Sequence, residues 1–282
     1  MQAKWLVDQY MIDHNEQDVV GILRAQGFEV TTRAYNRLER TPQLAPFSAN
    51  DCAVIYGSLQ FVAQHKSLPI LPGAYFQPNA LQCSVYTNHI PTELLLNSAS
   101  IMATFGDLRR RPDFFKNIFG ATAFVRPNSS QKIFAGCLLS EWESELAALQ
   151  QTSSVTDETL VVVSPPQTIL SEHRLFVVNR EVITATQYQK NGDVCLAPTS
   201  PSEAWEVARL MAANPWQPDI AYVCDVALTP SEPKIVELNA ISTSGWYLAD
   251  IPLLTQALSA AAVAEWNGDL CLGDEPLPKI KL

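Results

Sequence analysis

The sequence predicts an α/β protein whose C-terminal part belongs to the α+β class. Over residues 1–90, short apolar strands alternate with helices, which is typical of a parallel α/β unit. Residues 91–119 are mostly helical in pattern, and from Ala121 onward strands and turns dominate. We therefore expect an N-terminal parallel α/β domain over residues 1–95. A second domain over residues 96–282 should contain two α+β subdomains.

The N-terminal elements follow from apolar runs and the residues that interrupt them. A helix is expected over residues 15–26, with Asn15 as its N-cap and Gly27 as its C-terminal stop. A second helix is expected over residues 59–65. Strands are expected over residues 4–8, 28–35, 51–58, 68–76 and 83–88.

The C-terminal part has the pattern of strands separated by polar loops. A helix is expected over residues 139–150, where Ser140 and Glu143 have the spacing of a capping box. The turn at Asn179-Arg180 should join two alternating strands into a hairpin. Other strands are expected over residues 122–127, 133–136, 159–164, 171–178 and 181–189, and other helices over residues 202–213 and 251–266.

Composition excludes several classes of function. The chain has 282 residues, of which 47% are hydrophobic, and its formal charge of -10 argues against a nucleic-acid-binding surface. Its six cysteines are scattered without a CxxC pair, which favours reduced thiols in a cytoplasmic protein. The N-terminus lacks the apolar stretch of a signal peptide, and the apolar run at 251–266 is too short and too polar to span a bilayer. We expect no membrane partner.

The most informative stretch is the apolar pair of strands on either side of the turn at Ser231. If they form a hairpin centred there, Asp225 lies opposite Glu237, and Asn239 shares the face of Glu237 because alternate side chains of a strand point the same way. Two carboxylates and an amide oxygen suit Mg²⁺. A register slip of one residue would separate them. The rest of this face should be buried, namely Ala221, Val223 and Ile235.

Two upstream motifs carry complementary charge. Arg126 and Lys132 flank a small polar loop that could hold a polyphosphate, although a basic surface turn has the same pattern. Glu172 and Arg174 share one strand face, where an acid could bind ribose hydroxyls and a guanidinium a transferred phosphoryl group. A cross-strand salt bridge is the alternative. His173 faces the other side and is interpreted as structural.

The order of these motifs resembles the ATP-grasp superfamily. A cationic phosphate loop precedes an apolar strand, then an acid-x-Arg strand, an Asp, and finally the Glu-x-Asn of VELNAISTSGWY. The resemblance covers about residues 115–265 and is strongest to a small branch with Arg-Pro where most members have Lys-Pro. Ser164-Pro165-Pro166 departs from the family, which usually has Gln-Glu or Glu-Lys after the apolar strand.

The resemblance implies a role for each motif. The nucleotide cleft should lie between residues 115–163 and residues 164–282. Within it, phosphates would be held by Arg126 and Lys132, adenine by the backbone of Val162, Val163 and Ser164, and the ribose by Glu172. Arg174 would assist the chemistry, and Mg²⁺ would be bound by Asp225, Glu237 and Asn239.

These roles imply an ATP- and Mg²⁺-dependent ligase that joins a carboxylate to an amine through an acyl phosphate and releases ADP. The alternatives are a phosphotransferase on the same scaffold and a nucleotide-binding module without turnover. The acceptor would be a small molecule or a peptide, selected by the N-terminal domain and the loop over residues 242–247. A homodimer is the default expectation for assembly.

Overall fold

The N-terminal sheet consists of four parallel strands in the order β2-β1-β3-β4. The computed structural model of the protein describes residues 2–14, 16–39 and 42–273. Because side chains alternate along β1, Trp5 and Val7 pack on one face under α2 and α9, while Leu6 packs on the other face under α3. The elements are β1 (Lys4–Asp8), α1 (Gln9–His14), α2 (Val19–Ala25), β2 (Val30–Arg33), β3 (Cys52–Tyr56), α3 (Leu59–His65) and β4 (Leu71–Gly73).

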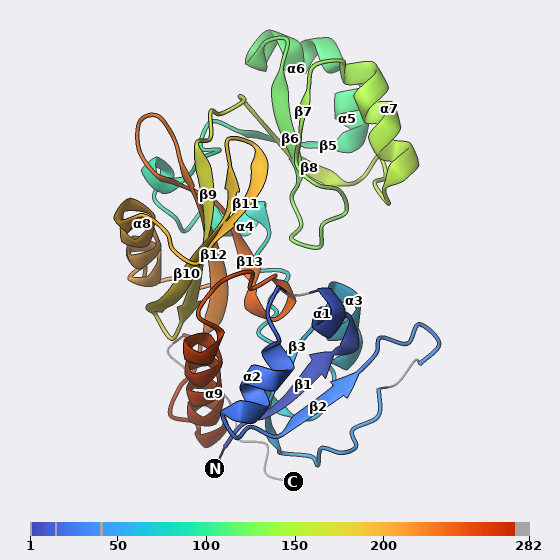
Figure 1. The fold of residues 1–282 in the computed structure, drawn as a ribbon. Coiled ribbons are helices and arrows are strands. Elements are labelled where there is room, and N and C mark those ends of the chain that lie inside the picture. The colour runs from blue at the N-terminus through green and yellow to red at the C-terminus, as the bar shows by residue number, and fades with distance from the viewer. Residues whose placement is uncertain (1, 15, 40–41, 274–282) are drawn as a thin grey trace.

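A second sheet of four antiparallel strands, in the order β5-β8-β6-β7, forms the upper part of the molecule in Figure 1. Three helices cover one of its faces, where Phe105, Phe115 and Trp142 pack against Val125 and other strand residues. The elements are β5 (Ile101–Thr104), α5 (Phe105–Arg110), α6 (Pro112–Phe119), β6 (Ala123–Pro127), β7 (Cys137–Leu139), α7 (Trp142–Thr152) and β8 (Leu160–Ser164). The connection from the first sheet contains α4 (Cys83–Tyr86) and the 3-10 turn η1 (Thr92–Leu94).

The third sheet has five antiparallel strands in the order β11-β10-β9-β12-β13 and lies between the other two (Figure 1). Helix α8 packs on one of its faces through Ala204, Val207 and Met211. The elements are β9 (Ser171–Val178), β10 (Glu181–Lys190), β11 (Asp193–Ala197), α8 (Ser202–Ala212), β12 (Ala221–Leu228), β13 (Lys234–Ala240), the 3-10 turn η2 (Ile241–Thr243) and α9 (Ile251–Asn267).

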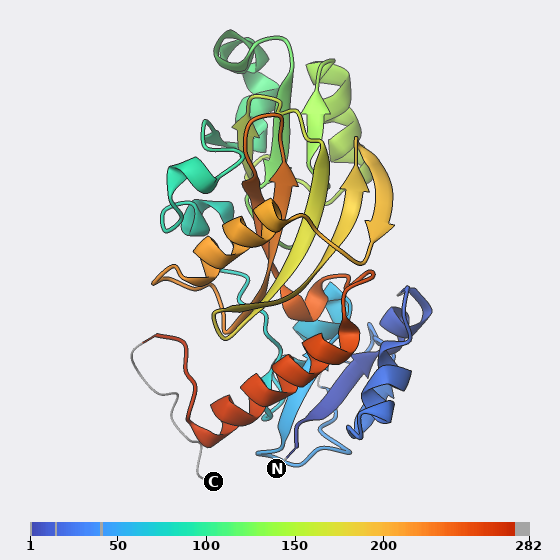
Figure 2. The same cartoon turned by 60° about the vertical axis from the view of Figure 1, so that its left-hand side comes forward.

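Helix α9 ties the third sheet to the N-terminal domain, as the turned view of Figure 2 shows. The indole of Trp5 donates to Ser259 Oγ at 3.1 Å, and Tyr75 donates to Glu265 Oε1 at 2.7 Å. None of the helices in the described ranges has the length and apolar character needed to cross a membrane.

Several local expectations need correction. The stretch expected to be helical over residues 91–119 contains the strand β5, because residues 101–104 pair with β8 along their length. Residues 83–86 form the helix α4 rather than a strand, and β7 begins at Cys137 rather than at residue 133. Residues 193–197, expected to lie in a loop, form β11, which pairs with β10.

Two helix starts also differ from the prediction. The helix expected from residue 15 is divided into α1 and α2, and Asp18 caps α2 by accepting from the amide of Gly21. The predicted cap Asn15 lies outside the described residues. Gly27 follows α2 with a φ of 85°, as expected for a C-terminal stop. Helix α7 begins at Trp142, and Glu145 rather than Glu143 accepts from the amides before it.

Candidate nucleotide and metal site

The β12–β13 hairpin has the predicted register at its functional end. Asp225 lies opposite Glu237, and Val223 lies opposite Asn239. A bulge follows, so that Val226 pairs with Ile235 one position out of step. The prediction for Ile235 is therefore wrong in its face. Ile235 is buried, but in the core cluster that contains Cys224, on the side of the hairpin away from Asp225.

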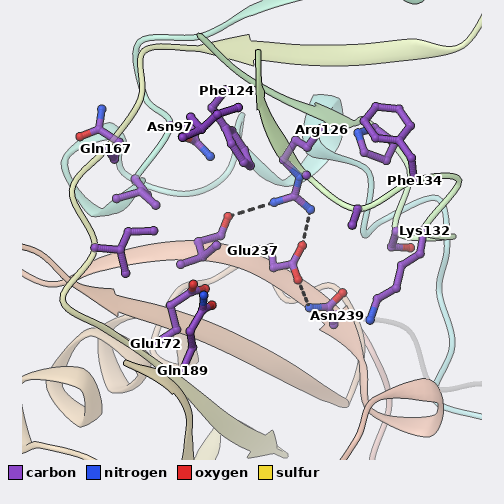
Figure 3. Close-up of a pocket in the computed structure, with 18 of the residues that line it drawn as sticks. Asn97, Phe124, Arg126, Lys132, Phe134, Gln167, Glu172, Gln189, Glu237 and Asn239 are labelled. Carbon is purple, nitrogen blue, oxygen red and sulfur yellow. Dashed lines mark hydrogen bonds and ion pairs between the residues drawn. The ribbon is translucent and has the colours of Figure 1, made fainter. Parts of the chain in front are cut away.

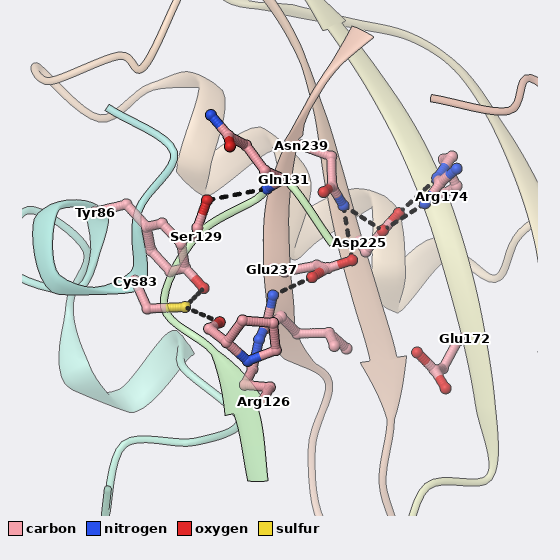
Figure 4. A network of polar contacts seen from close by, with 12 residues as sticks. Cys83, Tyr86, Arg126, Ser129, Gln131, Glu172, Arg174, Asp225, Glu237 and Asn239 are labelled. Atoms are coloured by element: carbon pink, nitrogen blue, oxygen red, sulfur yellow. Dashed lines mark hydrogen bonds and ion pairs between the residues drawn. The ribbon is translucent and has the colours of Figure 1, made fainter. Parts of the chain in front are cut away.

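The three predicted oxygen ligands meet at the amide group of Asn239. Its Nδ2 atom donates to Asp225 Oδ2 at 3.0 Å and to Glu237 Oε1 at 2.8 Å (Figure 4). Half a turn of this amide would direct Oδ1, instead of Nδ2, to the point where the two carboxylates converge. Within the described residues, no group of three or more His, Cys, Asp or Glu is arranged to hold a metal, so a site here depends on the amide oxygen.

Arg126 joins the two antiparallel sheets. It projects from β6, and its guanidinium forms an ion pair with Glu237 on β13 and donates to the carbonyl of Val236 at 3.2 Å (Figure 3). Burial would raise the pKa of Glu237. The Arg126 charge and the hydrogen bond from Asn239 outweigh that effect and lower the pKa to about 2. Glu237 is therefore ionised at neutral pH.

A cavity of about 490 Å³ opens between the two sheets around this ion pair (Figure 3). Glu172, Glu237 and Asn239 line it from the five-stranded sheet, while Arg126 and Lys132 line it from β6 and the loop that follows. Lys132 has a φ of 51° and forms no ion pair within the described part of the chain. The apolar part of the lining contains Leu96, Phe124, Phe134, Leu138 and Ile169.

Glu172 and Arg174 share the predicted strand but have different surroundings. Glu172 lines the cavity and accepts from Tyr188 Oη at 2.6 Å. Burial raises its pKa, and the hydrogen bond from Tyr188 opposes this shift. His173 points to the other side, is fully buried, and contacts the hydroxyls of Ser171 and Ser200, as its structural interpretation requires.

Arg174 is buried rather than directed into the cavity. Its Nε and Nη2 atoms donate to the two carboxylate oxygens of Asp225 at 2.9 and 2.8 Å, and Nη1 donates to the carbonyl of Gly245 at 3.1 Å. The guanidinium also lies over the rings of Tyr188 and Tyr247. All three nitrogens therefore have partners, and Arg174 connects β12 to the loop after the Glu-x-Asn strand.

The structure does not bring Val162, Val163 and Ser164 to the cavity. They lie in β8, between β5 and β6, so the backbone of the two valines is paired on both sides. Ser164 is buried and donates to Asn97 Oδ1 at 3.0 Å. The segment that lines the cavity begins just beyond the strand, with Gln167 and Ile169.

Sequence reasoning missed several polar residues of the cavity, including Asn97, Gln167 and Gln189. Asn97 lies in a segment that was expected to be helical. Gln189 is two residues after Gln187 on an alternating strand, and this spacing was the available signal that it lies on one face. Gly136 also lines the cavity, and a Cβ atom there would lie 2.6 Å from the ring of Phe124.

Comparison with known proteins identifies the family. The model of an ATP-grasp domain, the second family of its clade, matches residues 101–257. The protein belongs to this ATP-grasp family. The match runs from the first residue of β5 into α9, so it contains both antiparallel sheets and most of the cavity between them. A search of curated proteins found no match.

Solved structures show the same ATP-grasp fold at low sequence identity. D-cycloserine synthetase DcsG aligns with a TM-score of 0.63 and 14% identity, over 92% of this chain and 99% of that one. D-alanine--D-alanine ligase from Bacillus anthracis gives 0.61 and 11%, over 95% and 100%. The ATP-grasp ligase PsnB complexed with its minimal precursor gives 0.54 and 14%, over 94% and 99%. These alignments include the N-terminal domain as well as the two sheets.

Proposed function

We propose that this protein is an ATP- and Mg²⁺-dependent ligase that joins a carboxylate to an amine through an acyl phosphate and releases ADP. The observation that carries the proposal is the opposition of charge across the cavity. Arg126 and Lys132 face Glu237 and Asn239 from the other sheet. Cations can bind phosphates, and oxygen ligands can bind the metal that accompanies them.

The residues present fit Mg²⁺. Asp225, Glu237 and Asn239 already share hydrogen bonds, so their oxygens can converge on one cation after the amide of Asn239 rotates. When bound there, the metal would offset negative charge that develops on the phosphates. The two carboxylates also balance the adjacent guanidinium groups of Arg126 and Arg174.

The ion pair between Arg126 and Glu237 suggests how the site changes with occupancy. In this structure Glu237 uses Arg126 as its partner. A metal cation at Glu237 would take over that role and leave the guanidinium for a phosphate. Lys132, with no ion pair among the described residues, would bind a second phosphate group. The ribose would be held by Glu172, which lines the same cavity.

The remaining assignments follow from position. Val162, Val163 and Ser164 lead into the base site, and we assign contacts with the base to Gln167 and Ile169, which follow them and line the cavity. Arg174 supports the reaction by holding Asp225 and the loop at Gly245 in place. We propose a small-molecule or peptide acceptor, since PsnB was solved with a precursor peptide and DcsG is a synthetase of a small molecule. A cytoplasmic homodimer is the proposed working form.

Two measurements test this function. Calorimetric titration should show binding of Mg-ATP to the wild type and its loss in Glu237→Gln, while the exposed control Glu181→Gln retains it. ADP release is then measured across pooled amino acids, peptides and small acids, with mass spectrometry of the products. A condensed product supports the ligase, and a phosphorylated product without condensation supports a phosphotransferase. Full turnover in Glu237→Gln would refute the assignment.

A further inference from the structure

A second hollow, of about 530 Å³, lies in the N-terminal domain at the carboxyl ends of the parallel strands. Asp8 at the end of β1, Ala34 after β2 and Ser58 after β3 contribute to its lining. In the strand order β2-β1-β3-β4, the chain leaves β1 in opposite directions toward β2 and β3. Ligands of open parallel sheets bind outside the carboxyl ends at such a switch point.

The lining of this hollow has a negative character. Among its described residues, Asp8 carries the single formal charge. Arg33 precedes the lining residue Ala34 but turns away, because its guanidinium donates to the carbonyl of Gln43. Asp8 is fully buried, and its carboxylate is held by the amide and hydroxyl of Ser58 at 3.0 and 2.6 Å. The charge therefore acts on the hollow from beneath its surface.

Two tyrosines present aromatic surface to the same hollow. The side chains of Tyr10 and Tyr35 are 52% and 42% exposed. Gln9 and Gln60 add neutral polar groups to the lining and are also exposed. Aromatic faces attract cations and do not attract carboxylates. Together with the buried charge of Asp8, they favour an ammonium group over an anion.

The hollow is adjacent to the nucleotide cavity along the chain. Ser58 and Gln60 line the hollow, while Leu59 between them lines a small pocket that it shares with Lys132 and Asn239. The turn before Ser58 is fixed to the loop after the Glu-x-Asn strand, because the Gly57 amide donates to the Ser242 carbonyl at 2.9 Å. A substrate held in the hollow is thus next to the residues assigned to phosphate and metal.

We propose that this hollow binds the amine-bearing end of a substrate, and that Tyr10, Tyr35 and Asp8 select a cationic group there. This inference rests on the proposed ligase function, since it supplies a place for one of the two substrates. The aromatic faces provide the contact surface, and the buried carboxylate provides the preference for positive charge.

The test uses two probes with the same ring and opposite charge, phenethylamine and phenylacetate. The full chain is labelled with 3-fluorotyrosine, and the fluorine NMR signals are assigned from Tyr10→Phe and Tyr35→Phe. Phenethylamine should shift the two signals in a saturable way, with a Kd at least about fivefold lower than that of phenylacetate. The variant Tyr35→Ala should weaken this binding, while Leu38→Ala, an exposed residue outside the lining, should not.

Equal or tighter binding of phenylacetate, or no shift with phenethylamine, would overturn the inference. Binding of Mg-ATP is measured on the same samples to separate this result from the proposed function. Mg-ATP binding without phenethylamine binding rejects the amine site and leaves the nucleotide site standing. Selective phenethylamine binding without Mg-ATP binding supports the hollow and rejects the ligase proposal.

Discussion

Removing the Arg174 side chain should destabilise the protein strongly, because Asp225 would lose its main partner in a buried position. Asp225 has no exposed surface, and Arg174 is 4% exposed. The variant Arg174→Met deletes both hydrogen bonds to this carboxylate and the bond to the Gly245 carbonyl. Breaking a buried ion pair from one side costs about 3–5 kcal/mol. A loss of this size lowers the Tm by roughly 6–20 °C in a chain of this length.

Thermal unfolding followed by circular dichroism measures this loss. Arg24→Met, an exposed arginine on α2, is the matched control and should keep the wild-type midpoint. The double variant Arg174→Met with Asp225→Leu removes both charges, and it should recover most of the stability, because a packed apolar pair carries no desolvation penalty. The reasoning fails if Arg174→Met keeps the wild-type midpoint, or if the double variant is no more stable than the single one.

Three further predictions follow from single residues. The pKa of Glu237 is lowered from 4.5 to about 2, so the native state binds fewer protons than the unfolded state in that window; stability should fall as pH drops through it, less steeply in Glu237→Gln, as urea midpoints at several pH values can show. Burial raises the pKa of Glu265 from 4.5 to about 7, so stability should fall as pH rises through that window; at pH 8, Glu265→Gln should be more stable than wild type by roughly 1–3 kcal/mol, and an unchanged urea midpoint would contradict this. Gly136→Ala should displace the Phe124 ring and weaken Mg-ATP binding by about tenfold in calorimetry, with the Tm nearly unchanged; wild-type affinity would refute the contact.

Local sequence patterns were sufficient where an element depends on its own side chains. The strands β1 and β9 and the helix α3 have the predicted bounds, because apolar runs and flanking breakers define them within a few residues. The register at Asp225 and Glu237 could also be predicted, since a hairpin joined by a short turn restricts which residues face each other. The family resemblance followed from the order of charged motifs, and the family match confirms it.

The assignments that needed the tertiary structure depend on partners far away in the chain. β5 lies within a stretch of helical pattern, and its pairing with β8 about 60 residues later decides its conformation. The bulge that turns Ile235 away from the site arises from unequal residue counts on the two strands, which alternation alone does not reveal.

The site shows the same division. Its residue types could be read from the sequence because each type suits one kind of ligand. The sequence could not determine that Arg126 reaches Glu237 across two sheets, or that Arg174 is committed to Asp225 and Gly245. Nor could it show that the strand at Val162 is paired on both sides. The sequence by itself determined which chemical groups are present and their order. The packing of the sheets decided which of them face the cavity, because side-chain direction and backbone pairing depend on contacts between distant segments.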